Sequence, residues 1–168
     1  MTCISLIGMP GAGKSTLGVL LAKAMAKDFV DTDVLLQVRA NQSLQAIVDN
    51  SGYLMLRQLE EEALLDLSVN NHVIATGGSA VYSEAGMRHL KSLGPLVYLK
   101  VSLGELQRRV KDLPKRGIAA QPGQTLEELY KERCPLYEDV TDITVDGDGK
   151  TPEQLVAEIE RTTRRSER

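Results

Sequence analysis

The chain has 168 residues and a mass of 18.4 kDa, which matches one domain with a core of its own. Hydrophobic residues make up 42% and charged residues 26%, close to the averages of globular proteins, which excludes wholesale disorder. The net charge of -3 and the isoelectric point near 5.5 argue against nucleic-acid binding, because nonspecific nucleic-acid binders are basic.

Strand-like and helix-like segments alternate along the chain. In chain order, the patterns predict a strand at 2–7, a helix at 14–27, a strand at 28–32, helices at 34–39, 43–50 and 56–69, a strand at 72–76, a helix at 83–93, a strand at 96–101, a helix at 103–110, a helix at 125–137 up to its proline, a strand at 143–145 and a last helix opening at Thr151-Pro152.

Apolar strands that alternate with helices are typical of a parallel sheet covered on both faces. We therefore expect a three-layer α/β/α fold, and a single domain over residues 1–168, because we find no repeat and no linker. Residues 111–124 have no apolar period and contain prolines and glycines, which favours a mobile lid. The polar C-terminal tail, residues 160–168, is expected to fray.

The two cysteines, Cys3 and Cys134, are far apart in the sequence and form no metal-ligand motif. Two free thiols are typical of a reducing compartment, so we expect a cytoplasmic protein. The N-terminal segment has no basic stretch before its apolar residues, which favours a strand over a signal peptide. No apolar run approaches the roughly 18 residues of a membrane-spanning helix, so we expect no membrane partner.

The sequence GMPGAGKS at residues 8–15 completes the phosphate-loop motif GxxxxGK[ST], between a predicted strand and a predicted helix. The glycines allow successive backbone N–H groups to converge on phosphate oxygens, and the helix N-terminus adds its dipole. Lys14 supplies a positive charge for the β- and γ-phosphates, and Ser15 offers a hydroxyl to Mg²⁺. An ordinary glycine turn before a helix is the structural alternative.

Asp31 and Asp33 lie at the end of the second predicted strand. Because ligands of open α/β sheets bind at the carboxyl ends of the strands, both carboxylates are expected to face the same crevice as the phosphate loop. One of them can hold Mg²⁺ through water, and the other can accept a proton from an acceptor hydroxyl. The structural alternative is that Asp33 caps a helix and Asp31 is solvated.

Two further features have both a functional and a structural interpretation. Arg57 and Glu60 are three residues apart on one predicted helix, so they can form a surface ion pair, or Arg57 can be held in a fixed pose to bind a carboxylate. Gly77 and Gly78 either let backbone approach a ligand or only form a turn.

Two arginines complete the candidate site. Arg116 lies in the predicted lid, from which it can swing over transferring phosphates, although a lone arginine in a polar loop is more often solvated. Arg133 precedes the sequence CPLY, where it either anchors an anionic acceptor or caps the helix C-terminus.

Taken in order, GMPGAGKST, DTD, LRQLE, ATGG, a lid arginine, ERCPLY and a late TPE resemble the shikimate kinase family over almost the whole chain. The phosphate loop is common to many nucleotide-binding proteins, whereas the combination is much more specific. The resemblance implies a P-loop NTPase fold and a kinase that transfers the γ-phosphate of ATP to the 3-hydroxyl of shikimate. It also implies ATP and Mg²⁺ as cofactors, a small anionic acceptor, and, we expect, a monomer.

The resemblance assigns a role to each motif residue of this chain. The phosphates would be held by Gly11, Ala12, Gly13, Lys14, Ser15, Thr16 and Arg116. Ser15 would bind Mg²⁺ directly and Asp31 would bind it through water. Asp33 would be the base and would contact the acceptor hydroxyls, with Lys14 and Arg116 as the catalytic cations. The acceptor would also be held by Arg57, Gly77, Gly78 and Arg133. The adenine would lie near Arg108 or Arg109 and the turn before Pro152.

The chain differs from the family pattern at several positions around the acceptor. A third glycine is replaced by Ser79, a glutamate after DTD by Gln37, and a glutamate before the arginine helix by Tyr53. These differences motivate an alternative, a divergent kinase of another small hydroxy acid or polyol. A nucleotide-binding module without acceptor turnover is a third hypothesis, against which Asp33, Arg57 and Arg133 argue. A nucleoside monophosphate kinase is a weaker one, because its larger acceptor needs more structure.

Overall fold

The computed structural model describes residues 2–111 and 117–166. Within them, a five-stranded parallel sheet has the order β2-β3-β1-β4-β5. The strands are β1 (Ile4–Ile7), β2 (Asp28–Asp31), β3 (His72–Ala75), β4 (Leu96–Lys100) and β5 (Ile143–Asp146). The helices are α1 (Lys14–Met25), α2 (Thr32–Ala40), α3 (Leu44–Ser51), α4 (Tyr53–Leu65), the 3₁₀ turn η1 (Ala80–Tyr82), α5 (Glu84–Leu93), α6 (Leu103–Arg109), α7 (Leu126–Val140) and α8 (Pro152–Ser166).

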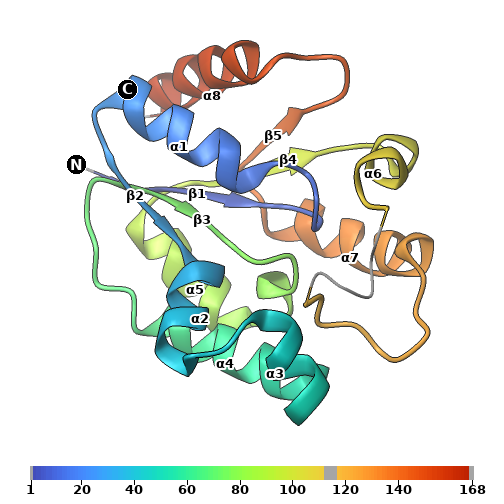
Figure 1. Ribbon diagram of the computed structural model, residues 1–168. Helices are drawn as coiled ribbons and strands as arrows, with labels where there is room; N and C mark the ends of the chain where they lie inside the picture. Colours follow the sequence, from blue (N-terminus) through green and yellow to red (C-terminus); the bar gives the residue numbers. More distant parts are fainter. Residues whose placement is uncertain (1, 112–116, 167–168) are drawn as a thin grey trace.

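Helices cover both faces of the sheet, as predicted (Figure 1). Helices α1 and α8 pack against each other on one face, and α4, α5 and α7 lie on the other. The core is built from strand residues and the helix residues that face them, and its strands β1 and β4 are buried along almost their full length. This is the three-layer architecture that the sequence predicts. None of the described helices is both long and apolar enough to cross a bilayer.

The sheet register places the motifs side by side. Asp31, the last residue of β2, is aligned with Ala75, the last residue of β3, and Ala75 is aligned with Leu6 of β1. Thr76 then ties β3 to β1, because its backbone N–H and its hydroxyl both donate to the Leu6 carbonyl, at 3.2 and 2.9 Å. The phosphate loop, the aspartates and the Gly77-Gly78 turn therefore leave the same edge of the sheet.

Side-chain caps explain most helix boundaries. Asp31 accepts hydrogen bonds from the backbone N–H groups of Asp33 and Val34, so α2 begins at Thr32, two residues before the predicted start. Asp31 is thus the cap, and the alternative in which Asp33 has that role is wrong. Gly52, with φ of 85°, ends α3 and begins α4, which explains why α4 starts at Tyr53 instead of residue 56.

Two predictions at the C-terminal side are wrong. Helix α7 runs through Pro135 to Val140, because only the one N–H of Pro135 is lost and the helix continues to pack on the core through Tyr137. The polar tail, residues 160–168, does not fray over its described part: α8 continues to Ser166, and Thr163 is buried there with its hydroxyl donating to the Ile159 carbonyl. The described part of the predicted lid, residues 117–124, contains no helix or strand.

Candidate active site

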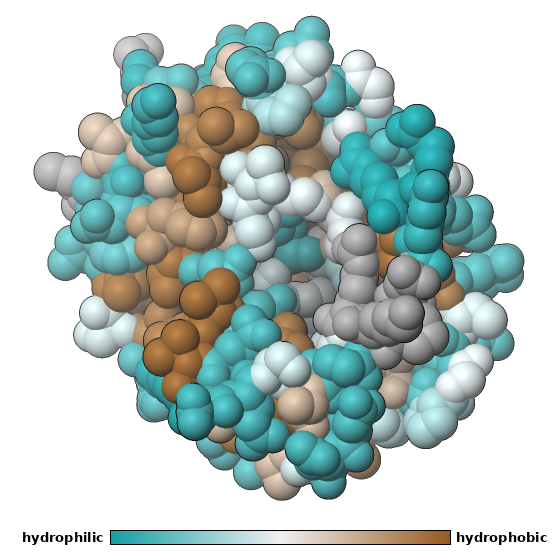
Figure 2. All heavy atoms as spheres, in the orientation of Figure 1, coloured by the Kyte–Doolittle hydropathy of each residue, from teal (hydrophilic) through white to brown (hydrophobic). Residues whose placement is uncertain are grey.

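A cavity of about 290 Å³ opens at the carboxyl ends of the strands. The surface in the orientation of Figure 1 is hollowed near its centre, and both hydrophilic and hydrophobic residues border the hollow (Figure 2). The predicted site residues that line the cavity are Gly11, Gly13, Lys14, Ser15, Thr16, Asp33, Gly78 and Arg133. The lining does not include four other predicted site residues, Ala12, Asp31, Arg57 and Gly77. Asp31 contacts Ser15, and Gly77 packs against Glu60 and Asp33, all of which line the cavity. Arg116 lies outside the described residues.

The phosphate loop has the backbone conformation that its glycines predict. Gly11 and Gly13 have φ of 80° and 96°, in the left-handed region that favours glycine, and Gly13 caps α1. The Lys14 ammonium donates to the carbonyl oxygens of Gly8 and Met9 at 2.7 and 2.8 Å. Burial lowers the pKa of Lys14 to about 8, which still leaves it mostly protonated at neutral pH. The loop therefore holds one cation beside its converging N–H groups.

The two residues predicted to hold magnesium lie in direct contact. The Ser15 hydroxyl donates to Asp31 Oδ2 at 2.5 Å, and both side chains are partly open to solvent. Asp31 Oδ1 is committed to the cap of α2, so Oδ2 is the oxygen that faces the phosphate loop. One hydroxyl and one carboxylate beside a phosphate site form an all-oxygen donor set, and Mg²⁺ typically takes few protein ligands together with phosphates and water. The residues present therefore fit the ion.

Asp33 and Glu60 form a pair of carboxylates in the cavity. Glu60 is 3% exposed. Burial raises the pKa of Asp33 to about 6, with a further contribution from Asp31, and raises that of Glu60 to about 7, with a further contribution from Asp33. Gly77 packs directly behind them, because a Cβ there would lie 2.0 Å from Glu60 Oε1 and 2.6 Å from Asp33 Oδ1. The glycine is needed for the close approach of two carboxylates.

This pair predicts how stability depends on pH. Both pKa values are raised in the folded state, so the folded protein binds more protons than the unfolded chain, and the free energy of unfolding rises as pH falls. We expect a gain of about 2 kcal/mol between about pH 7.5 and 5.5, measured by urea denaturation. The double variant Asp33→Asn/Glu60→Gln should lose this gain. Glu132→Gln, which removes a carboxyl whose pKa is lowered, should keep it. An unchanged slope in the double variant would contradict the assignment.

The surface ion pair between Arg57 and Glu60, one of the two interpretations of their spacing, is not formed among the described residues. Glu60 instead accepts a hydrogen bond from the Ser79 hydroxyl, and the Arg57 guanidinium lies 3.7 Å from the centre of the Tyr82 ring and 5.2 Å from that of Tyr53. Residues three apart on a helix can pair, but Glu60 faces the cavity and Arg57 packs on aromatic rings. Of the two interpretations given for Arg57, the fixed pose is the one the geometry favours.

Arg133 is fully buried and lies inside α7, which continues to Val140, so the alternative in which it caps the helix C-terminus is wrong. Its Nη2 donates to the carbonyl of Ala119 at 2.7 Å and its Nε to the Tyr82 hydroxyl at 3.3 Å. Its Nη1 has no hydrogen-bond partner among the described residues. A buried cation with a free donor at a cavity wall is a site for an anion.

The motif that contains Arg133 also shapes the glycine turn. The fully buried Tyr137 of the CPLY sequence donates from its hydroxyl to the Gly78 carbonyl and stacks on Tyr98, with ring centres 5.1 Å apart. The backbone at Gly78 is packed against Pro10 of the phosphate loop, where a Cβ would lie 2.6 Å from the proline ring. Gly77 and Gly78 therefore allow the backbone to approach the two carboxylates and the phosphate loop. Their role is more than the formation of a turn.

The positions where the chain differs from the family pattern have structural explanations. The Ser79 hydroxyl is bonded to Glu60 instead of projecting freely into the cavity that it lines. Gln37 Oε1 accepts from the Leu44 backbone N–H at 3.2 Å, so this side chain supports the start of α3 and does not line the cavity. Gly117 stands where the family pattern has a proline. It has φ of 61° and donates its N–H to Gln45 Oε1 at 2.8 Å, neither of which a proline permits.

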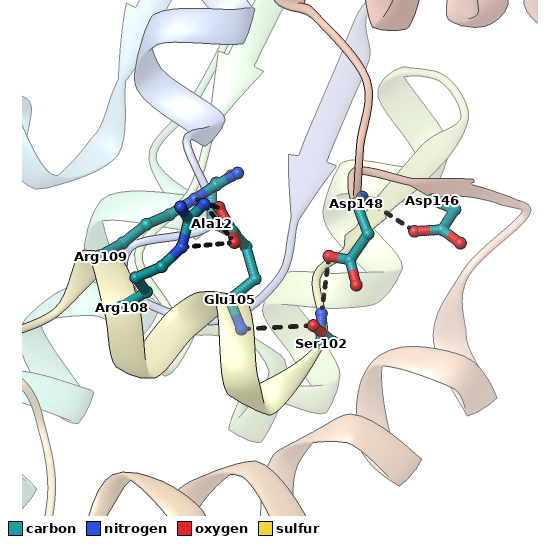
Figure 3. Close-up of polar contacts among 7 residues, drawn as sticks. All are labelled: Ala12, Ser102, Glu105, Arg108, Arg109, Asp146 and Asp148. Carbon is teal, nitrogen blue, oxygen red and sulfur yellow. Dashed lines mark hydrogen bonds and ion pairs between the residues drawn. The ribbon is translucent and has the colours of Figure 1, made fainter.

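A polar cluster on α6 contacts the phosphate loop at Ala12 (Figure 3). Glu105 accepts hydrogen bonds from both Arg108 and Arg109, and Arg109 Nη1 donates to the carbonyl of Ala12 at 3.2 Å. The Ser102 backbone N–H donates to Asp148 Oδ1 at 3.0 Å, which joins the start of α6 to the turn after β5. Arg109 is thereby fixed beside the loop, where the resemblance places the adenine.

Sequence reasoning missed the roles of four residues. The sequence spacing offers Glu60 only as a partner of Arg57, and it gives no indication of the contacts of Tyr82, Tyr137 and Glu105. A signal existed for Tyr137, which belongs to a motif, but its partner Gly78 is 59 residues away in the chain. No local pattern identifies Tyr82, because its contacts come from α4 and α7.

Comparisons with known proteins show the family to which this chain is related. A family model described as shikimate kinase matches residues 10–164. A shikimate kinase of Pasteurella multocida is 36% identical over 160 residues, which are 93% of this chain and 91% of the relative.

Two solved structures are similar over the whole fold. A shikimate kinase from Aquifex aeolicus vf5 has 34% identity and a TM-score of 0.79, covering 95% of this chain and 94% of that one. A shikimate kinase from Acinetobacter baumannii, in complex with shikimate, has 29% identity and a TM-score of 0.87, covering 96% and 92%.

Proposed function

Since the chain belongs to the shikimate kinase family, we propose that it transfers the γ-phosphoryl group of ATP to the 3-hydroxyl of shikimate. The observation that carries this proposal is the composition of one cavity. It is lined by the phosphate loop, by Asp33 in the first turn of α2 and by Arg133 of α7. A nucleotide, a hydroxyl and a carboxylate can therefore be bound by one continuous set of side chains.

The nucleotide side would be held by the loop from Gly11 to Thr16. The converging N–H groups and the Lys14 ammonium would balance the charge of the β- and γ-phosphates. Ser15, and Asp31 through water, would hold Mg²⁺, which when bound neutralises charge on the transferring phosphates. Arg109, which Glu105 holds in place, would face the adenine of ATP. The role of Arg116 in the lid stays a prediction.

On the acceptor side, Arg57 and Arg133 would bind the carboxylate of shikimate and orient its ring. Asp33, with a pKa of about 6, is mostly ionised at neutral pH and can accept a proton. In the transfer, the acceptor hydroxyl loses its proton to Asp33 and its oxygen forms a bond to the γ-phosphorus. The bond between that phosphorus and the β–γ bridging oxygen breaks, ADP leaves, and Asp33 releases the proton to solvent.

We further propose that the enzyme is a monomer in a reducing, cytoplasmic compartment. One chain supplies all of the side chains named here, which supports a monomeric enzyme. The two cysteines are free and buried, which supports a reducing, cytoplasmic compartment.

The direct test is product identification. The purified chain is incubated with γ-³²P-labelled ATP, Mg²⁺ and shikimate, and the products are separated. We expect one labelled phosphate ester of shikimate, formed in equal amount to ADP, and no ester when EDTA removes Mg²⁺. Label that appears only as inorganic phosphate, or ATP that is bound without any transfer, would overturn the proposal.

A further inference from the structure

Tyr82 is the last residue of the η1 turn that follows Gly77, Gly78 and Ser79. Its ring centre lies 3.7 Å from the guanidinium carbon of Arg57 and 5.3 Å from that of Arg133. Arg57 comes from α4 and Arg133 from α7, so a single half-buried ring joins two arginines that are 76 residues apart in the chain (133 − 57). No motif in the sequence marks this tyrosine.

Neither arginine is paired with a carboxylate among the residues that the structure describes. Arg57 Nε and Arg133 Nη1 are buried there without a hydrogen-bond partner. Two cations at one place repel each other, and burial removes the water that would stabilise them. Something must hold both without using up the donors that an anion needs.

An aromatic ring meets this requirement. The face of the ring attracts a guanidinium through its quadrupole, and this leaves the N–H groups at the guanidinium edge free. Tyr53 provides a second ring for Arg57, at 5.2 Å. A carboxylate in the position of Tyr82 would instead accept those N–H groups and cancel their charge.

The hydroxyl of Tyr82 has a second effect. It accepts a hydrogen bond from Arg133 Nε and donates one to Glu132, whose other oxygen accepts from Gln124 Nε2 at 2.9 Å. The Tyr82 hydroxyl lowers the pKa of Glu132, which keeps that carboxylate ionised. The negative charge of Glu132 thus lies near the arginines with the tyrosine between them, and it does not occupy their free donors.

We propose that Tyr82 is a positioning residue of the acceptor site, which holds Arg57 and Arg133 against one ring so that their free N–H donors together bind the carboxylate of the acceptor. Tyr82 acts through the arginines and does not line the cavity. The proposal rests on the proposed function, because shikimate is the carboxylate used to test it.

The test compares Tyr82→Leu with Tyr82→Phe in steady-state assays with shikimate. Loss of the ring should raise the KM for shikimate about five- to tenfold, and loss of the hydroxyl alone about twofold. The KM for ATP should stay unchanged and kcat should change less than twofold. Tyr130→Leu is the matched control, because this half-buried tyrosine of α7 packs on the core and, among the described residues, neither arginine lies over its ring. It should leave the KM for shikimate unchanged.

A second arm separates positioning from general loosening of the fold. Each variant is also assayed with shikimate methyl ester, which lacks the carboxylate charge. We expect the wild type and Tyr82→Leu to have the same KM for the ester, because the arginines have no anion to bind. If the Leu substitution raises both KM values equally, or raises neither, the proposal is overturned. If Tyr82→Leu does not fold, two other variants are compared in the same way. Tyr82→Phe removes only the hydroxyl, and Tyr53→Leu removes the second ring that contacts Arg57.

The two proposals fail in different ways. A wild-type chain that does not phosphorylate shikimate would overturn the proposed function. A wild-type chain that does so, with a KM that is insensitive to the ring at position 82, would overturn only the role of Tyr82.

Discussion

Asp33→Asn should lower kcat with shikimate by about 10² to 10⁴-fold, the usual contribution of a general base. The amide keeps the size of the side chain but cannot accept the proton of the hydroxyl. The affinity for ATP should change little, because Asp33 is not among the residues that would bind the phosphates. The measurement pairs steady-state ADP release with equilibrium ATP binding at pH 7, below the pKa of about 8 of Lys14. That pH is needed because Asp33 helps to keep Lys14 protonated.

Asp31→Asn is the matched control for this substitution. Asp31 contacts Ser15, so removal of its charge should weaken Mg²⁺-dependent ATP binding, whereas asparagine caps a helix as well as aspartate and should leave α2 and the stability of the fold largely unchanged. The two aspartates should therefore divide cleanly between transfer and binding. If ATP affinity collapsed in Asp33→Asn, Asp33 would be a metal or structural residue, and its assignment as the base would be wrong.

Arg133→Met should lower kcat/KM for shikimate by about 10²-fold or more, since a buried, hydrogen-bonded charge pair costs about 2–5 kcal/mol when one partner is removed. Methionine fills part of the volume but offers no donor to a carboxylate. Arg133→Lys should recover only part of the loss, because an ammonium cannot reproduce the planar fork of a guanidinium.

The control is Arg88→Met, which removes an exposed arginine paired with Glu84 on α5. It should leave kcat/KM within twofold of the wild type. The KM for ATP should be unchanged in all of these arginine variants. A loss of ATP affinity in Arg133→Met that matches the loss for shikimate would contradict the placement of Arg133 on the acceptor side.

The sequence predicts the order of strands and helices and the phosphate-loop half of the site, because those signals are local. The motif residues 8–15 lie on one short segment, and their glycines have the positive φ that their identity predicts. The apolar pattern likewise identifies α1 and β4, because their own side chains form the surface that is buried. Errors at helix ends arise where a side chain from the preceding strand acts as the cap, as Asp31 does for α2.

The acceptor half depends on contacts between distant segments. Sequence spacing suggests a pair between Arg57 and Glu60, yet Glu60 is bonded to Ser79 and Arg57 lies on Tyr82. These partners are set by how α4 packs against the turn after β3, which no local pattern describes. The substitution at Ser79 is explained in the same way, because a hydroxyl there has a buried carboxylate within reach.

The same packing explains why the net charge of -3 does not describe the site. Lys14 and Arg133 are both buried at the cavity, while most acidic side chains of the described ion pairs are exposed. These two buried cations suit two anionic substrates, because buried charges are screened less by water and salt than exposed ones, and Asp33 and Glu60 share the cavity with them.

In the function proposed here, this chain phosphorylates shikimate and binds the carboxylate of shikimate through its arginines. The most direct measurement is kcat/KM from ADP release, with ATP and Mg²⁺ saturating, for shikimate and for a panel of other hydroxy acids and polyols. We expect kcat/KM for shikimate to exceed that of every other acceptor by about 10²-fold or more, the discrimination typical of a site built for specific polar groups. Equal or better turnover of another acceptor, or ATP binding with no acceptor-dependent ADP release, would contradict the account.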